Sequence, residues 1–324
     1  MSIGPHVITR RSIIAGAGAF AAAAAPATRT WSAEYTAQKG SVSLAMYRKR
    51  ATAPSGGHPA LPVLFLVHGS SLSARTSYDL AVPGRDDYSM MNIFAGFGYD
   101  VWTMDHENYG KSSRTAGNSD IASGAADLKA GIDLVLRETG RSKVHLFGES
   151  SGGLRAGVYA MQHSRSVDRL VLAAFTYKGE GSPTLAKRAE QLDYYRTHNT
   201  RLRDREMIHG IYTRDKAGTT DPAVADAVAD TELKFGDQVP TGTYLDMTAN
   251  LPVVDPAKVL APVLLLRGEY DGIATIDDLS EFYKRLPNGD RQFVILPGAA
   301  HSLITNINRR QTMHAVRSFL EMPA

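Results

Sequence analysis

The chain has 324 residues, 43% of them hydrophobic and 21% charged, which is the composition of a globular protein and excludes an intrinsically disordered one. The 36 Lys and Arg residues nearly balance 33 Asp and Glu residues, and a net charge of +3 without a basic run gives no support to nucleic-acid binding. The absence of cysteine excludes disulfides, thiolate metal sites and a cysteine nucleophile.

Residues 1–33 have the layout of an export signal followed by a short linker. Arg10-Arg11 precedes an uncharged stretch rich in Ala and Gly, and Ala25-Pro26-Ala27 offers small residues for cleavage there or later. The paired arginines resemble a twin-arginine (Tat) signal. The alternative is a retained helical anchor, but the apolar stretch is shorter than the roughly 20 residues that a spanning helix needs. We therefore predict a periplasmic or secreted protein with no stable membrane insertion after cleavage.

Short apolar runs alternate with helical patterns over the rest of the chain. The expected strands cover residues 61–67, 99–104, 144–147, 170–175, 262–266 and 292–296. The expected helices cover residues 90–97, 121–139, 154–163, 277–286 and 311–320. This alternation predicts an α/β fold with a mostly parallel central sheet and helices on both of its faces.

Two segments depart from this alternation. Residues 34–60 are expected to form an edge hairpin that turns at Pro54-Ser55-Gly56-Gly57. Residues 177–255 show helical patterns, many charged and aromatic residues and no convincing strand. We interpret residues 177–255 as a helical cap inserted into a core that consists of residues 34–176 and 256–324.

The sequence Gly148-Glu149-Ser150-Ser151-Gly152 lies between an expected strand and an expected helix. A G-x-S-x-G motif in this position places its serine on a sharp turn, from which the hydroxyl projects above the sheet. The glycines let neighbouring chain approach closely, and the N-terminus of the following helix favours negative charge. Ser150 is therefore the candidate nucleophile.

A serine hydroxyl needs a base, and two residues downstream are placed to complete a triad. Asp271 follows the strand 262–266, and His301 follows the strand 292–296. Because parallel strands place functional groups beyond their carboxyl ends, we expect both residues to lie with Ser150 at one edge of the sheet. The chain order of serine, acid and histidine fits such a triad. The rival acids are Glu269 and Asp277, and the rival bases are His163, His198 and His209.

These motifs resemble the α/β-hydrolase superfamily, in its capped esterase- and lysophospholipase-like branch, over residues 40–321. His68-Gly69-Ser70-Ser71 is similar to the H-G-x-x oxyanion loop of that family. Residues 105–112 are similar to its D-x-x-G-x-G-x-S loop, with Asn108 where a glycine is usual. The resemblance implies that the backbone N–H groups of Ser70 and Ser151 form an oxyanion hole, and that no metal or organic cofactor is needed.

The predicted function is cleavage of a carboxylic ester through an acyl-enzyme, with Ser150 as nucleophile, His301 as base and Asp271 orienting the base. The partner is a small-molecule ester or a related carbonyl compound. Lactonases, amidases, aminopeptidases and carbon–carbon bond hydrolases use the same triad, and a non-catalytic ligand receptor is the remote alternative. An aminopeptidase would need acids in the cap, where the sequence offers Glu180, Glu190 and Asp193. The sequence leaves the physiological substrate and the oligomeric state open.

Overall fold

The computed structural model describes residues 30–55 and 60–323. Residues 1–29 of the predicted export segment lie outside this range, and the last residues assigned to its linker, 31–33, begin the first strand. Among the described residues, no helix combines the length and the apolar character needed to cross a membrane.

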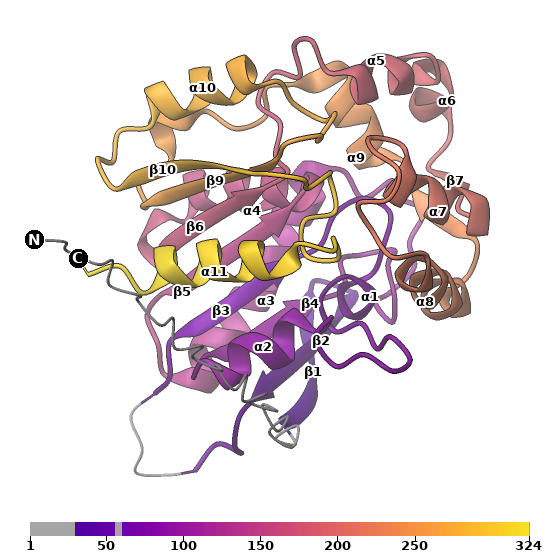
Figure 1. The fold of residues 1–324 in the computed structure, drawn as a ribbon. Helices are drawn as coiled ribbons and strands as arrows, with labels where there is room; N and C mark the ends of the chain where they lie inside the picture. The colour runs from indigo at the N-terminus through magenta and orange to yellow at the C-terminus, as the bar shows by residue number, and fades with distance from the viewer. Residues whose placement is uncertain (1–29, 56–59, 324) are drawn as a thin grey trace, which may run out of the picture.

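An eight-stranded sheet forms the centre of the described structure (Figure 1). Its strands lie side by side in the order β1 (Trp31–Lys39), β2 (Val42–Arg50), β4 (Asp100–Met104), β3 (Val63–Val67), β5 (Val144–Glu149), β6 (Val167–Ala173), β9 (Val263–Gly268) and β10 (Arg291–Leu296). Strand β2 runs antiparallel to both of its neighbours, and all other pairs are parallel. The predicted mostly parallel sheet is confirmed.

Helices cover both faces of this sheet, as predicted (Figure 1). One face packs against α3 (Ile121–Thr139), α4 (Ser151–Gln162) and α10 (Ile276–Arg285). The other packs against α1 (Ala74–Tyr78), α2 (Met90–Gly96) and α11 (Arg309–Leu320). Every residue of β3 is buried, because its side chains point alternately into the two apolar layers. This explains the continuous apolar run in its sequence.

The edge hairpin turns at a different place from the one that the sequence predicted. Strands β1 and β2 pair from Lys39 and Val42 outward, so Gly40 and Ser41 form a two-residue turn. Gly40 has a φ of +59°, which a hairpin of this length favours. The prediction of a turn at Pro54–Gly57 was wrong, because that Pro- and Gly-rich stretch belongs to the connection after β2. Its residues 56 and 57 lie outside the described range.

The chain between β6 and β9 folds over the carboxyl ends of the parallel strands. Its elements are α5 (Pro183–Ala189), α6 (Leu192–Thr197), β7 (Thr200–Leu202), α7 (Arg205–Thr213), α8 (Pro222–Glu232), β8 (Gln238–Pro240) and α9 (Gly242–Leu245). Strands β7 and β8 pair antiparallel, although the sequence showed no convincing strand in this cap. Each strand is only three residues long and too short for a periodic pattern to reveal it.

A buried ion pair joins this cap to the loop that follows β3. The side chains of Arg203 and Glu232 form a salt bridge and are 2% and 0% exposed. Oε2 of Glu232 also accepts hydrogen bonds from the backbone N–H and the hydroxyl of Ser73, at 3.0 and 2.7 Å. Arg203 donates to the carbonyl oxygen of Ser71 at 3.2 Å. The pair therefore fixes the cap against the loop that carries Ser70.

We expect Glu232→Ala to lower the free energy of unfolding by about 3–5 kcal/mol, because it leaves a guanidinium buried without its counter-charge. Urea unfolding followed by circular dichroism measures this loss. The matched control is Asp230→Ala on the same helix. Asp230 pairs with Arg205 at the surface, where the two side chains are 64% and 49% exposed, and solvent screening makes that pair weak. Equal losses of unfolding free energy in the two variants would contradict the conclusion that the buried pair of Arg203 and Glu232 stabilises the fold.

Candidate active site

The turn between β5 and α4 holds Ser150 in a strained conformation. Ser150 has a φ of +59° and a ψ of −129°, a region that non-glycine residues rarely occupy. A Cβ atom on Gly152 would lie 2.1 Å from the carbonyl oxygen of Val67, and one on Gly148 would lie 2.4 Å from that of Gly152. Only glycine fits at both positions, and this close packing permits the sharp turn.

The loops after β9 and β10 bring Asp271 and His301 together. Nδ1 of His301 lies 2.9 Å from Oδ1 of Asp271, and the two side chains are 7% and 1% exposed. The same oxygen accepts the backbone N–H of Ile273 at 3.0 Å. Burial opposes ionisation of Asp271, but the neighbouring His301 ring and its hydrogen bond hold the pKa of Asp271 below its usual range. An ionised Asp271 keeps the proton of His301 on Nδ1, which leaves Nε2 as an acceptor.

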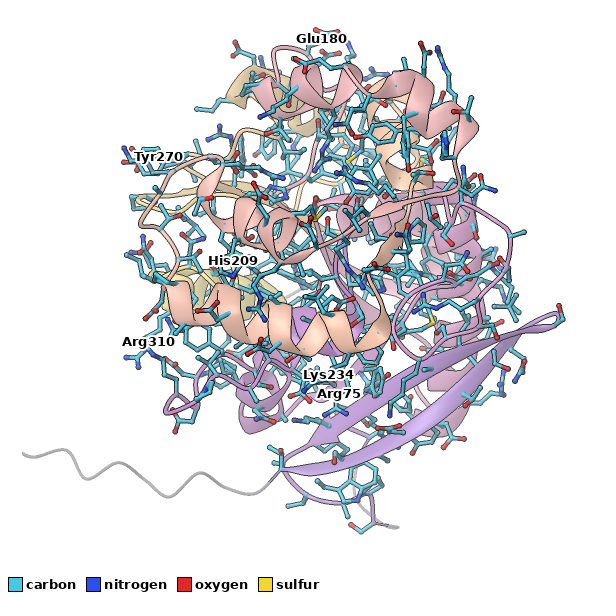
Figure 2. The ribbon with its side chains drawn as sticks, turned by 90° about the vertical axis from the view of Figure 1, so that its right-hand side faces the viewer. Arg75, Glu180, His209, Lys234, Tyr270 and Arg310 are labelled. Carbon is cyan, nitrogen blue, oxygen red and sulfur yellow. The ribbon has the colours of Figure 1, made fainter. Side chains whose placement is uncertain are left out.

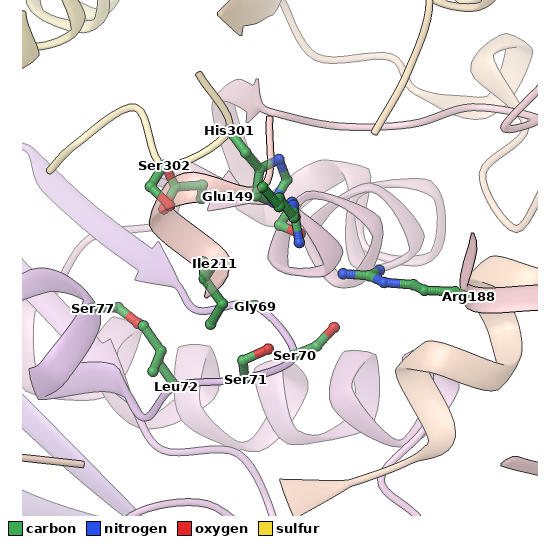
Figure 3. Close-up of a pocket in the computed structure, with 12 residues that line it drawn as sticks. Gly69, Ser70, Ser71, Leu72, Ser77, Glu149, Arg188, Ile211, His301 and Ser302 are labelled. Carbon is green, nitrogen blue, oxygen red and sulfur yellow. The ribbon is translucent and has the colours of Figure 1, made fainter. Parts of the chain in front are cut away.

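Ser150 and His301 line the same small pocket, in which Figure 3 shows His301 near Glu149 and Ser302. Within the described residues the His301 ring is hydrogen-bonded to Asp271 and not to the Ser150 hydroxyl, and catalytic contacts of this kind often tighten only in the complex with substrate. The rival acid Glu269 instead accepts the backbone N–H of Gly298. Of the rival bases, His209 pairs with Asp226 on the outside of the cap (Figure 2). The structure thus brings Ser150, Asp271 and His301 to one place.

The loop after β3 lies directly against the turn at Ser150. The hydroxyl oxygens of Ser70 and Ser151 are 2.7 Å apart, and Tyr109 donates to the carbonyl oxygen of Ser70 at 2.8 Å. Arg155 donates to the carbonyl oxygen of His68 at 3.1 Å from below. The backbone N–H of Ser70 donates to no other described residue, and that of Ser151 lies at the first position of α4, where a helix leaves its N–H groups free.

The neighbouring loop explains the asparagine that departs from the family motif. Asn108 has a φ of +69°, a left-handed conformation that asparagine tolerates better than most side chains. Its amide nitrogen donates to the carbonyl oxygen of Gly117 at 2.9 Å, and its amide oxygen accepts the N–H of Thr115 at 2.7 Å. Asn108 therefore keeps the turn that a glycine would make and adds hydrogen bonds across the loop.

The pocket at Ser150 opens into a larger cavity beneath the cap. The volume beside Ser150 is about 60 Å³, and the cavity next to it measures about 590 Å³. Both are lined by Ser71, Arg188, Ile211 and Arg214. Arg188 and Arg214 cannot be recognised from the sequence, since cationic side chains are frequent throughout the cap and no pattern distinguishes those that point inward.

A second carboxylate, Asp215, lies beside Asp271 and His301. Asp215, Asp271 and His301 each offer a possible metal-ligating atom, and these atoms lie within 4.8 Å of one another. An ion bound to Nδ1 of His301 would displace the hydrogen bond that Nδ1 donates to Asp271. One carboxylate oxygen of Asp215 contacts Nε of Arg214 at 3.3 Å. The arrangement therefore fits a hydrogen-bonded histidine better than a metal centre.

Glu149 connects the turn at Ser150 to the loop that carries His301. Its Oε1 accepts the backbone N–H of Leu303 at 2.9 Å. Burial raises the pKa of Glu149 to about 8, so that the carboxyl group is largely protonated at neutral pH. The folded protein therefore holds a proton that the unfolded chain releases near its ordinary pKa of 4.5.

This proton makes folding depend on pH. Between pH 4.5 and about 8 the folded state binds more protons at Glu149 than the unfolded state does, so stability falls as the pH rises, by at most about 1.4 kcal/mol per pH unit. Glu149→Gln stays neutral and should remove this contribution. Urea unfolding at several pH values measures it, with the exposed Glu138→Gln as the control. If the unfolding free energy fell with pH equally in Glu149→Gln and in the wild type, the proton on Glu149 would not be the cause of the dependence.

Several solved structures share this fold. A bacterial membrane phospholipase A described as a virulence factor has a TM-score of 0.66 at 17% identity, over 91% of this chain and 86% of its own. A carboxylesterase from Bacillus subtilis has a TM-score of 0.62 at 18% identity, over 92% and 94% of the two chains. An enol-lactonase from Burkholderia xenovorans has a TM-score of 0.62 at 18% identity, over 89% and 100%. At these identities the likeness shows the fold.

A match to a family model shows which family the chain belongs to, which the similar structures do not show. The model of the serine aminopeptidase family S33 matches residues 85–308, a span that holds Ser150, Asp271 and His301 together with the whole cap. This range covers well over half of the chain. The protein is a hydrolase with the α/β-hydrolase fold and belongs to the S33 serine aminopeptidase family.

Proposed function

We propose that this protein is an exported serine hydrolase that cleaves a carboxylic ester of a small molecule. The observation that carries the proposal is the buried hydrogen bond between Asp271 and His301, formed in a site where His301 and Ser150 line one pocket. The strained backbone at Ser150 adds support, because such strain collects at functional sites. The export part of the proposal is supported by Arg10-Arg11 and the apolar stretch after it.

The proposed reaction proceeds in two halves. Nε2 of His301 takes the proton of the Ser150 hydroxyl as its oxygen attacks the ester carbonyl, and Asp271 stabilises the imidazolium. The tetrahedral intermediate then collapses, the imidazolium protonates the departing alkoxide, and the acyl group stays on Ser150. Water, deprotonated by His301, attacks the acyl-enzyme. The imidazolium then returns this proton to the oxygen of Ser150 as its bond to the acyl carbon breaks and the carboxylic acid leaves.

The oxyanion of each tetrahedral intermediate needs donors that are already in place. The backbone N–H groups of Ser70 and Ser151 are the candidates, since neither donates to a carbonyl group elsewhere in the described loop and turn. Each such donor contributes on the order of 3 kcal/mol to transition-state stabilisation. The hydrogen bond between the two serine hydroxyls holds the donors at a fixed spacing.

An aminopeptidase activity, which the family name suggests, has little support in the cavity, because Asp215 is the one carboxylate among its described lining residues and already contacts Arg214. The ammonium group of such a substrate needs a carboxylate in the cap. Glu180, Glu190 and Asp193 line neither the pocket at Ser150 nor the cavity beside it, and Glu180 lies on the outer surface of the cap (Figure 2). Cationic side chains face this cavity instead, which favours an ester over a peptide with a free amino terminus.

The first test is covalent labelling with a fluorophosphonate probe and hydrolysis of p-nitrophenyl esters. We expect the wild type to be labelled and Ser150→Ala to lose both labelling and at least about 10,000-fold of kcat, because alanine removes the hydroxyl on which the proposed acyl-enzyme forms. Ser302→Ala is the matched control, since Ser302 lines the same pocket but has no role in the proposed reaction, and this variant should still be labelled. Labelling of Ser150→Ala would show that the nucleophile is another residue.

Asp271→Asn should fold normally but lose about 1,000- to 10,000-fold of kcat on p-nitrophenyl esters. The amide nitrogen can donate to Nδ1 of His301, which favours the tautomer that leaves no acceptor for the serine proton. Steady-state kinetics with the melting temperature as a folding check measure this effect. Glu269→Gln is the control. A larger loss of kcat in Glu269→Gln than in Asp271→Asn would show that Glu269, and not Asp271, is the acid that orients His301.

A further inference from the structure

The cavity beneath the cap is strongly cationic. Lys187, Arg188, Arg201 and Arg214 line it, whereas Asp215 is the one carboxylate among its lining residues in the described structure. Arg188 and Arg214 also line the pocket at Ser150, and Figure 3 shows Arg188 reaching from the cap into that pocket. Positive charge therefore extends to the place where a substrate would react.

Two of these arginines have no counter-ion within the described residues. Arg188 contacts the sulfur atom of Met247 at 3.8 Å, and Arg201 contacts the hydroxyl oxygen of Tyr195 at 3.4 Å, but the salt bridges among the described residues include neither arginine. Burial and the nearby charge of Arg214 lower the pKa of Arg188 to about 10, which still leaves it protonated at neutral pH. Both side chains are partly buried. A partly buried cation without a counter-ion is costly to the fold, and a bound anion would remove part of that cost.

The guanidinium groups of Arg188 and Arg201 both lie over the aromatic ring of Tyr244. The guanidinium carbons of Arg188 and Arg201 lie 5.1 and 5.0 Å from the centre of the Tyr244 ring. The hydroxyl group of Tyr244 is hydrogen-bonded to Ser71 at 2.7 Å, next to the proposed oxyanion donor Ser70. The cations are thus held at a fixed position relative to the reacting centre rather than on flexible surface stems.

The acids near this cavity do not cancel its charge. Glu149, which lines the pocket at Ser150, is largely protonated at neutral pH because burial raises its pKa to about 8. The carboxylate of Asp215 is already engaged, since it contacts Nε of Arg214 at 3.3 Å and the hydroxyl of Thr184 at 3.5 Å. Arg188 and Arg201 remain without a carboxylate.

We propose that Arg188 and Arg201 form an anion subsite, and that the substrate is an ester that carries a carboxylate at a distance from its scissile carbonyl. A planar guanidinium matches a carboxylate with two parallel N–H···O hydrogen bonds. The anion lies in the cap cavity while the ester carbonyl reaches Ser150 in the adjoining pocket. This inference rests on the proposed ester hydrolysis and specifies its substrate class.

The test compares two esters that differ in charge alone. Mono-p-nitrophenyl adipate carries a free carboxylate, and its methyl ester is the neutral analogue. We expect the wild type to prefer the anionic ester at least tenfold in kcat/KM, and Arg188→Gln to lower this preference at least tenfold. Arg188→Lys should keep part of it. Lys234→Gln, which removes an exposed cation of the same cap outside the cavity, should retain the wild-type preference (Figure 2).

Binding of adipate to Ser150→Ala, measured by calorimetry, tests the subsite without any turnover. We expect adipate to bind, and Arg188→Gln in the same background to weaken binding at least tenfold. If no ester is hydrolysed but adipate binds in this way, the proposed reaction fails and the anion subsite stands. A preference for the neutral ester, or adipate binding that Arg188→Gln leaves within twofold, would overturn the subsite. Binding of inorganic phosphate but not of adipate would overturn the proposal that the anionic group of the substrate is a carboxylate.

Discussion

The close approach of α4 to β3 is the constraint on which the rest of the site depends. Gly152 lies so near the carbonyl oxygen of Val67 that a methyl group there would sit 2.1 Å away. This approach forces the turn at Ser150 into positive φ and also brings Ser70, which follows β3, against Ser151. One backbone contact therefore sets both the proposed nucleophile and the proposed oxyanion donors, and any side chain at 152 would separate them.

The parallel strands then determine where the acid and the base can lie. Strands β5, β6, β9 and β10 are consecutive neighbours in the sheet, so the loops beyond their carboxyl ends meet above the same edge. Asp271 and His301 each need only a short loop to reach the position opposite Ser150. Glu149 closes this arrangement, because its hydrogen bond to Leu303 ties the turn after β5 to the loop after β10.

The sequence predicted the core of this fold better than its periphery, for a physical reason. Strands such as β3 are buried on both faces, and their continuous apolar runs are visible without knowledge of the neighbours. The hairpin turn at Gly40 and the strands β7 and β8 have no comparable apolar run. Their positions depend on which strands pair with each other, and the local sequence does not show this pairing. The three proposed triad residues were found because each follows a predictable strand.

The cationic cavity could not be predicted in this way, because the sequence does not show which side of a cap helix faces inward. Arg188 and Arg196 are both basic residues of short helices in the cap, yet Arg188 lines the cavity while Arg196 pairs with Asp193 at the surface. The core of the protein offers the proposed chemistry to any carbonyl that reaches Ser150. Because the cations that line the cavity all belong to residues 177–255, the proposed choice of an anionic ester depends on the insertion and not on Ser150, Asp271 and His301.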